Sequence, residues 1–174
     1  MSSSSRHGSQ HEGSQRREYP ERPIAGVGSV VLRRVAGRRQ VVLARRKAEP
    51  MAGCWSLPGG AMELGETVRE ACIRETMEET GLRVDPIAVV EPFDIIQRDA
   101  EGRVQYHYLV VDFLCHLRGD ESEGEARAGS DVGEVVWADV QGVLEEGDFA
   151  LTARACTVIR RALEMEMEWD EGEV

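Results

Sequence analysis

Short segments rich in apolar and β-branched residues recur along the chain and predict a series of strands. Residues 24–32 mix small and β-branched side chains, and residues 38–46 contain a Val-Val-Leu run, so both segments predict strands, with Gly37 at the turn between them. Residues 55–60 form a short extended segment that ends in breakers and is followed by a loop to Gly65. Further strands are predicted at residues 82–97, where Pro86 and Pro92 break the pattern, at 105–117 and at 134–137.

Two longer segments have the residue spacing of helices. Residues 67–80 contain no Gly or Pro, carry glutamate in the first turn and stop at Gly81, which is typical of a residue just past a helix end. Residues 152 to about 167 predict a second helix, with Thr152 as its N-cap. The apolar residues that recur at helical spacing in it are Ala155, Cys156, Ile159, Ala162 and Leu163.

The order of these segments predicts an α/β sandwich. Residues 105–117 carry bulky side chains on both sides of the alternation, which favours a sheet covered on both faces. A chain of 174 residues has room for one domain with a core of its own. We expect a disordered arm at residues 1–19, one domain over residues 20–168 and a tail at residues 169–174. We also expect that the arm can be removed with little effect on function.

Composition and charge narrow the classes of partner. The formal net charge of −11 at pH 7 argues against broad nucleic-acid binding, because the field of the chain repels polyphosphate. No segment reaches the roughly 18 to 20 apolar residues that a membrane span needs. The widely spaced Cys54, Cys72, Cys115 and Cys156 form no metal-type pair and suit a reducing compartment. We therefore expect a cytoplasmic protein that binds neither nucleic acid nor membrane.

Glutamates gather on one face of the predicted helix at residues 67–80. Glu75, Glu78 and Glu79 are three and four residues apart, which places them within about one 100° arc. A solvated helix face is the alternative interpretation, since the chain has 32 acidic residues. Like charges at these spacings repel, however, by a few tenths of a kcal/mol per pair. A hard divalent cation would turn this repulsion into a binding site, so the pattern favours a site for Mg²⁺ or Mn²⁺.

A wider set of positions around these glutamates resembles a known family motif. The spacing is similar to that of the Nudix box and is carried by Gly60, Glu66, Arg74, Glu75, Glu78, Glu79, Gly81 and Leu82. From about residue 24 to residue 163 the chain resembles a Nudix hydrolase. This resemblance implies an α/β/α sandwich with a mixed β-sheet between helices, and a box that forms a loop, a helix and a loop.

The resemblance also implies roles for individual residues. The metal ligands that it implies are Glu75, Glu78, Glu79 and the carbonyl oxygen of Gly60. Glu66 and Arg74 match positions that brace the loop and the helix by pairing. Thr76 departs from the family pattern, because an aliphatic residue is usual there. Since threonine is nearly the size of valine, we expect little functional consequence.

The chemistry follows from the charges of a diphosphate. A diphosphate repels a hydroxide nucleophile, so a metal ion must neutralise phosphate oxygens and lower the pKa of the attacking water. The sequence leaves the proton acceptor open between glutamates of the box, Glu75 and Glu78, and a glutamate outside it. Glu125 is the best outside candidate, because residues 124–131 are similar to the corresponding loop of related proteins. The other outside candidates are Glu121, Glu123 and Glu134.

Segments outside the box bear on the substrate. Residues 55–60 and 106–113 resemble the ADP-ribose pyrophosphatase-like subgroup, which makes ADP-ribose, cleaved to AMP and ribose 5-phosphate, the first expected substrate. Candidate substrate-binding residues are Arg45 and Arg46, with the neighbouring Lys47, and Tyr108. Two alternatives stay open: a nucleoside-triphosphate pyrophosphohydrolase that removes damaged nucleotides, and a Nudix module that senses a nucleotide without cleaving it. A homodimer is one expected assembly, since homodimers are common in the resembling families.

Overall fold

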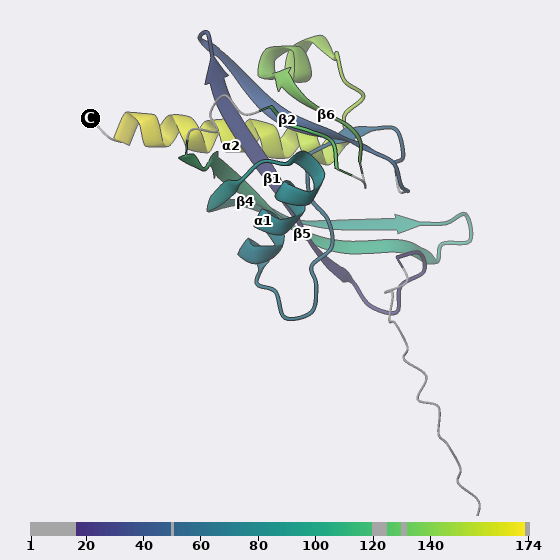
Figure 1. Cartoon of the computed structure of the whole chain (residues 1–174). Helices are drawn as coiled ribbons and strands as arrows, with labels where there is room; N and C mark the ends of the chain where they lie inside the picture. The colour runs from purple at the N-terminus through teal and green to yellow at the C-terminus, as the bar shows by residue number, and fades with distance from the viewer. Residues whose placement is uncertain (1–16, 50, 120–124, 130–131, 173–174) are drawn as a thin grey trace, which may run out of the picture.

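The computed structural model describes residues 17–49, 51–119, 125–129 and 132–172. Within these residues a six-stranded sheet forms the centre of the molecule (Figure 1). Its strands are β1 (Ile24–Val35), β2 (Arg38–Arg46), β3 (Trp55–Ser56), β4 (Val84–Arg98), β5 (Val104–Leu117) and β6 (Val132–Asp139). The strand order is β3-β2-β1-β5-β4, and β6 pairs with β2.

The sheet is mixed, as the family resemblance implies. β1 runs parallel to β5 from Ile24 opposite Tyr108 to Val31 opposite Cys115, whereas the other pairs are antiparallel. The final residues of β1 pair instead with β2 across the tight turn that contains Gly37. The predicted strand at residues 38–46 therefore agrees with β2.

The expectation that prolines break the fourth strand is wrong. β4 is continuous from Val84 to Arg98, and its register against β5 shifts after Pro86 and again between Val89 and Glu91. Proline cannot donate a backbone hydrogen bond, so it is tolerated mainly in edge strands and at bulges. β4 lies at the end of the strand order, so it can contain both prolines.

Local signals place the first helix. α1 (Val68–Thr80) begins after Thr67, whose hydroxyl accepts the Glu70 backbone N–H while the Glu70 carboxylate accepts the Thr67 N–H. This reciprocal capping satisfies donors that the first turn leaves unpaired. Gly81 ends the helix in a left-handed conformation with φ of 71°. The sequence prediction for this helix is thus confirmed to within one residue.

The C-terminal part of the chain adds two further elements. η2 (Gly142–Glu146), a short π-helix, was not predicted. α2 (Ala153–Gly172) starts as predicted at Thr152, whose hydroxyl accepts the Ala155 N–H at 3.3 Å. The helix continues through residues 169–172, which the sequence analysis assigned to a tail, because the segment after residue 167 contains no breaker before Gly172.

The two helices cover opposite faces of the sheet, α1 in front and α2 behind in the view of Figure 1. Successive side chains of the paired strands β1 and β5 point to opposite faces of the sheet, so these strands contribute apolar residues to the core on both faces. The layer beneath α1 includes Val27, Val31, Ala71, Cys72, Phe113 and Cys115. The layer beneath α2 includes Val30, Leu114, Ala155, Val158, Ile159 and Ala162. The predicted α/β/α sandwich is therefore confirmed.

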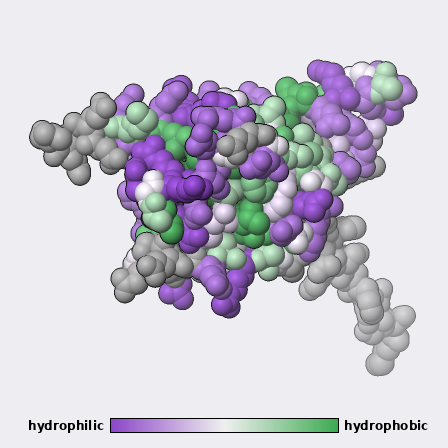
Figure 2. Space-filling view, turned by 90° about the horizontal axis from the view of Figure 1, so that it is seen from above, coloured by the Kyte–Doolittle hydropathy of each residue, from purple (hydrophilic) through white to green (hydrophobic). Residues whose placement is uncertain are grey.

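The predicted arm and the acidic loop lie partly outside the described residues. Residues 1–16, 120–124 and 130–131 fall there, and with them Glu121 and Glu123. Arg17 to Tyr19 are described, although the sequence analysis placed them in the arm. Hydrophilic residues predominate on the face that Figure 2 shows, with small hydrophobic areas between them. Among the described residues, no helix is both long and apolar enough to cross a bilayer.

A buried ion pair joins α2 to the centre of the sheet. Asp112 on β5 has no exposed surface, and both of its carboxylate oxygens accept hydrogen bonds from the Arg154 guanidinium, at 2.5 and 3.2 Å. Gly28, opposite Asp112 on β1, makes room for this contact, because a Cβ atom there would lie 2.1 Å from an Asp112 oxygen. Burial raises the pKa of Asp112, and the charge of Arg154 opposes that rise.

We predict that Arg154→Met lowers the free energy of unfolding by about 3 kcal/mol, because it leaves the Asp112 carboxylate buried without its cation. The double variant Asp112→Asn with Arg154→Met removes both charges and should recover part of the loss. Urea unfolding followed by tryptophan fluorescence measures both. Equal stability of Arg154→Met and the wild type would show that the pair does not stabilise the fold.

Candidate active site in a cleft beside helix α1

A cleft of about 790 Å³ opens beside α1, between the end of β2 and the loop that precedes the helix. It brings together carboxylates from α1 and cationic side chains from elsewhere. The charged and glycine residues that line it are Arg17, Arg46, Lys47, Gly59, Gly60, Glu63, Arg74, Glu75, Glu78 and Glu79. Residues that the sequence places far apart thus share one site.

Backbone hydrogen bonds hold the loop before α1 along β1. The Val27 N–H donates to the Gly60 carbonyl at 2.9 Å, and the Ser29 N–H donates to the Pro58 carbonyl at the same distance. The Met62 N–H donates to the Ala25 carbonyl at 3.0 Å. The Gly60 carbonyl oxygen, an implied metal ligand, therefore already accepts one hydrogen bond. It retains a second lone pair for another contact.

Two glycines allow the loop to approach this closely. Gly59 has φ of 152°, and a Cβ atom there would lie 2.1 Å from the Val27 carbonyl oxygen. A Cβ atom at Gly60 would lie 2.5 Å from the Glu75 carboxyl group. A side chain at Gly59 would push the loop away from the backbone of β1, and one at Gly60 would displace the Glu75 carboxyl group. The need for Gly60 in the box is therefore steric as well as chemical.

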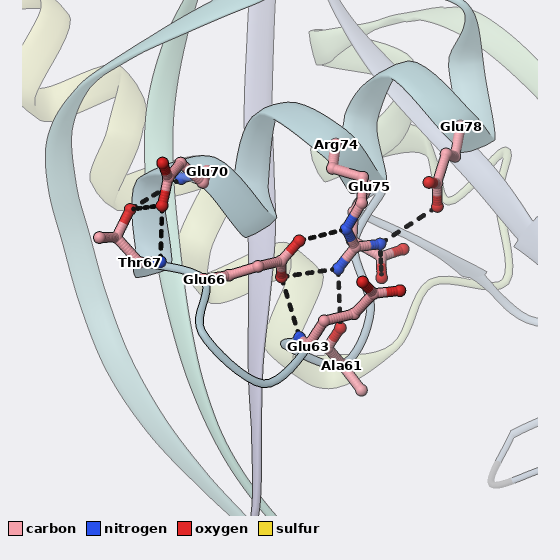
Figure 3. A network of polar contacts seen from close by, with 8 residues as sticks. All are labelled: Ala61, Glu63, Glu66, Thr67, Glu70, Arg74, Glu75 and Glu78. Carbon is pink, nitrogen blue, oxygen red and sulfur yellow. Dashed lines mark hydrogen bonds and ion pairs between the residues drawn. The ribbon is translucent and has the colours of Figure 1, made fainter. Parts of the chain in front are cut away.

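Arg74 links the loop to three glutamates (Figure 3). Its guanidinium binds both oxygens of Glu66, at 2.5 and 3.0 Å, and donates to the Ala61 carbonyl at 3.1 Å. The same group contacts Glu75 at 2.8 Å and Glu78 at 3.1 Å. A planar fork of donors suits such simultaneous contacts better than a lysine ammonium would. Arg74 therefore fixes the loop against the helix and offsets the repulsion between the carboxylates.

The three implied metal-binding glutamates all line the cleft but differ in surroundings. Only 14% of the Glu75 side chain is exposed, against 57% for Glu78. Burial raises the pKa of Glu75, although the charges of Arg74 and Arg17 act against the rise. The Glu79 carboxylate accepts the Gly59 N–H at 2.9 Å. Because burial disfavours the charged form of the Glu75 carboxyl group, a cation bound beside it would stabilise that form.

The donor set fits a hard divalent cation. It consists only of oxygens, from three carboxylates and one backbone carbonyl, which are the ligands that Mg²⁺ and Mn²⁺ prefer. As the side chains stand, no group of three acidic, His or Cys residues in the described ranges lies close enough together to hold an ion. Arg74 contacts Glu75 and Glu78, and the Gly59 N–H contacts Glu79, so each carboxylate already has a polar partner.

Thr76 has a structural role that its place in the sequence does not indicate. Its side chain is fully buried on the sheet side of α1, where its hydroxyl donates to the Cys72 carbonyl at 2.7 Å and lies 2.8 Å from the Ser29 hydroxyl. An aliphatic residue would leave the Ser29 hydroxyl without this partner. The departure from the family pattern is thus matched by a polar residue on β1.

Other predicted residues lie outside the cleft lining. Neighbouring strand residues point to opposite faces, and of Arg45 and Arg46 only Arg46 lines the cleft. Arg45 instead donates to the Gly53 carbonyl at 3.2 Å. Tyr108 pairs in register with the cleft residue Ile24 without lining the cleft itself.

Glu125 also lies away from the cleft lining, although its loop is close to α1. The Arg127 and Gly129 N–H groups donate to the Thr80 and Glu79 carbonyls, at 2.8 and 3.0 Å. The Glu125 side chain is 84% exposed, and its carboxylate lies 3.7 Å from the Arg127 guanidinium. The cleft lining thus contains Gly60, Glu75, Glu78 and Glu79 but not Glu125.

We predict that Glu66→Gln makes stability less sensitive to acid. The hydrogen bond from Arg74 and that from the Glu63 N–H lower the pKa of Glu66 from 4.5 to about 2. A carboxyl group with a lowered folded-state pKa stabilises the fold above pH 4.5, and this contribution is lost as the pH falls towards 2. The stability difference between wild type and Glu66→Gln should therefore be largest near neutral pH and shrink on acidification. Thermal unfolding between pH 6 and pH 3 measures it, with the exposed Glu63→Gln as control; a constant difference would contradict the assignment.

Known proteins are similar to this chain in sequence and in fold. The NUDIX domain model matches residues 23–156. An ADP-ribose pyrophosphatase of Methanocaldococcus jannaschii is 37% identical over 101 residues, which cover 58% of this chain and 55% of that protein. The chain spans about half of that relative, so the relative's activity applies to this chain only as a proposal.

Solved structures resemble the whole fold. The NUDIX domain of Shewanella oneidensis NrtR, complexed with ADP ribose, has a TM-score of 0.66 at 19% identity and covers 83% of this chain and 89% of that chain. A MutT NUDIX hydrolase of Burkholderia pseudomallei has a TM-score of 0.62 at 27% identity and covers 81% and 98%, respectively. Since the family model covers most of the sequence, including the loop and helix that form the cleft, the chain belongs to the Nudix family.

Proposed function

We propose that this protein is a divalent-metal-dependent hydrolase that cleaves the diphosphate linkage of a nucleoside diphosphate derivative. ADP-ribose is the first choice of substrate, with AMP and ribose 5-phosphate as products. The observation that carries the proposal is the convergence of Glu75, Glu78 and Glu79 on one cleft with the Gly60 carbonyl. A purely binding module has no need for this full set of carboxylates.

The distribution of charge in the cleft suits a diphosphate. Glutamates of α1 form one wall, and Arg46 and Lys47 at the end of β2 contribute cations to the lining. Cationic side chains bind phosphate oxygens, whereas the carboxylates would repel them unless a cation lies between. A cleft with both kinds of group therefore fits a phosphate ester that binds together with a metal ion.

The chain's own residues would divide the work of hydrolysis. Mg²⁺ or Mn²⁺ held by Gly60, Glu75, Glu78 and Glu79 would neutralise phosphate oxygens and lower the pKa of the attacking water. Glu78 is the most exposed of the three α1 glutamates in the cleft and is our first candidate to accept the proton of that water. Arg74 and Glu66 hold the helix and the loop in place during hydrolysis.

Resemblance to relatives supports the choice of substrate. The archaeal relative that is 37% identical over 101 residues is named as an ADP-ribose pyrophosphatase, and the NrtR domain of similar fold was solved with ADP ribose. The second candidate is a nucleoside-triphosphate pyrophosphohydrolase. It is favoured by the 50% identity, over 50 residues or 28% of this chain, to a Mycobacterium tuberculosis protein named as a putative 8-oxo-dGTP diphosphatase.

Product analysis decides between these functions. The purified protein is incubated with Mg²⁺ or Mn²⁺ and with ADP-ribose, sugar nucleotides, dinucleotides, or normal and oxidised triphosphates, and products are separated by chromatography. We expect AMP from ADP-ribose and no product when the metal is chelated. Release of diphosphate from a triphosphate would favour the second candidate. Saturable binding of one nucleotide without turnover would instead identify a sensing module and refute the proposed hydrolase.

We predict that Glu79→Gln lowers turnover by at least about a hundredfold while the fold stays intact, because the amide still accepts the Gly59 N–H but no longer carries the charge that binds a metal ion. Steady-state kinetics and far-ultraviolet circular dichroism measure the two effects. Glu168→Gln on α2 is the matched control, since this exposed glutamate does not line the cleft. A well-folded Glu79→Gln variant with full activity would refute the metal assignment.

A further inference from the structure

Arg17 lines the cleft although it comes before the first strand. It shares the lining with Arg46 and Lys47 from the end of β2 and with the glutamates of α1. Arg17 belongs to the segment that was expected to be a dispensable arm, because the residues around it offer almost nothing to bury. Its place in the cleft therefore depends on contacts that the sequence does not reveal.

Tyr19 and Glu18 attach this segment to the turn between β4 and β5. The Tyr19 N–H donates to the Gln105 carbonyl at 2.7 Å, and the Tyr19 hydroxyl donates to Asp99 at 3.1 Å. The Gln105 side-chain amide donates to the Glu18 carboxylate at 2.8 Å. The Arg103 guanidinium lies over the Tyr19 ring, 5.1 Å from its centre. The backbone, the hydroxyl and the ring of Tyr19 thus all contribute to holding the residues next to Arg17 in place.

The conformation of Tyr19 shows how strongly these contacts act. Its φ of 52° lies in the left-handed region, which non-glycine residues rarely adopt. Such a conformation persists only where surrounding contacts outweigh its strain. Asp99 is itself fixed, because it accepts the backbone N–H groups of Glu101 and Arg103, at 3.1 and 2.8 Å. The turn is therefore a preorganised anchor for the segment that leads to Arg17.

Arg17 and Arg46 come from separate segments of the chain and line the same cleft. The positive charges of both arginines also oppose the rise that burial causes in the pKa of Tyr108. Two guanidinium groups from separate segments that share one polar cleft form a suitable site for phosphate oxygens, which accept charge-assisted hydrogen bonds.

We infer that Arg17 is a substrate-binding residue that contacts a phosphate oxygen of the diphosphate, and that Tyr19 positions it by anchoring its segment to the β4–β5 turn. The inference rests on the proposed function for the identity of the substrate. It replaces the expectation that residues 1–19 can be removed with little effect. Because Arg17 acts in binding, its loss should weaken binding of the substrate in the ground state and in the transition state equally.

The first test compares Arg17→Ala with Arg22→Ala. Arg22 is an exposed arginine of the same segment that does not line the cleft, so it controls for the loss of one positive charge. Calorimetric titrations with adenosine, and with ADP whose two phosphates are joined by a methylene bridge, report binding directly in the presence of Mg²⁺ and without hydrolysis. We expect Arg17→Ala to weaken binding of the ADP analogue about tenfold, as loss of one charge-assisted contact does, and to leave adenosine binding unchanged. Arg22→Ala should leave both unchanged.

Kinetics provides the second readout. Arg17→Ala should raise KM for the substrate found in the product analysis about tenfold with little change in kcat, the pattern of lost uniform binding. If the wild type binds the ADP analogue in an Arg17-dependent way but hydrolyses nothing, the proposed hydrolase fails and the phosphate site stands. If the wild type is active and Arg17→Ala matches Arg22→Ala in both assays, the phosphate site is refuted and the hydrolase stands.

A double-mutant cycle tests the role of Tyr19. Tyr19→Phe keeps the ring over which Arg103 lies but removes the hydroxyl that donates to Asp99. We expect Tyr19→Phe alone to weaken binding of the ADP analogue by a smaller factor than Arg17→Ala, and to have no further effect in the Arg17→Ala background. Equal effects in both backgrounds would show that Tyr19 acts independently of Arg17 and would overturn its positioning role.

Discussion

The site depends on one constraint: the loop before α1, which contains Gly59 and Gly60, packs closely on three consecutive residues of β1. Val27 contacts the loop through both its N–H and its carbonyl, Gly28 leaves space for the ion pair beneath α2, and Ser29 meets Thr76 on α1. One short stretch of strand therefore fixes the loop and both helices at once. Because backbone atoms define these distances, the loop cannot move outward without breaking the hydrogen bonds that place the Gly60 carbonyl.

The site also depends on electrostatics, because carboxylates that lie near one another beside the core repel. Arg74 solves this by contacting three glutamates and a loop carbonyl with one rigid group. Its contact with Glu66 belongs to the framework, whereas its contacts with Glu75 and Glu78 are to groups proposed to bind metal. The same guanidinium thus contacts both the residue that braces the loop and the residues proposed to bind metal.

What the sequence could predict follows from whether the signal is local. Gly81 ends α1 through its own backbone conformation, so the helix was predictable to within one residue. Pro92 was misjudged because its tolerance depends on the edge position of β4, which only the sheet order reveals. Asp112 drew no attention, since its partner lies 42 residues away on α2. Whether Arg45 or Arg46 faces the cleft is likewise decided by the pairing of β2, and Arg17 is placed by a turn distant in sequence.

The overall charge of the protein gives these cleft cations their importance. A net charge of −11 repels a diphosphate at long range, so attraction must come from groups within a Debye length of the bound phosphates, about 8 Å at physiological ionic strength. Arg74 contributes little to that attraction, because its donors already contact carboxylates and a carbonyl. The remaining positive charge in the lining comes from Arg17, Arg46 and Lys47, together with any bound metal ion. Because Arg17 and the strand-end pair belong to different segments, the strength of substrate binding is coupled to how firmly the β4–β5 turn holds the segment before β1.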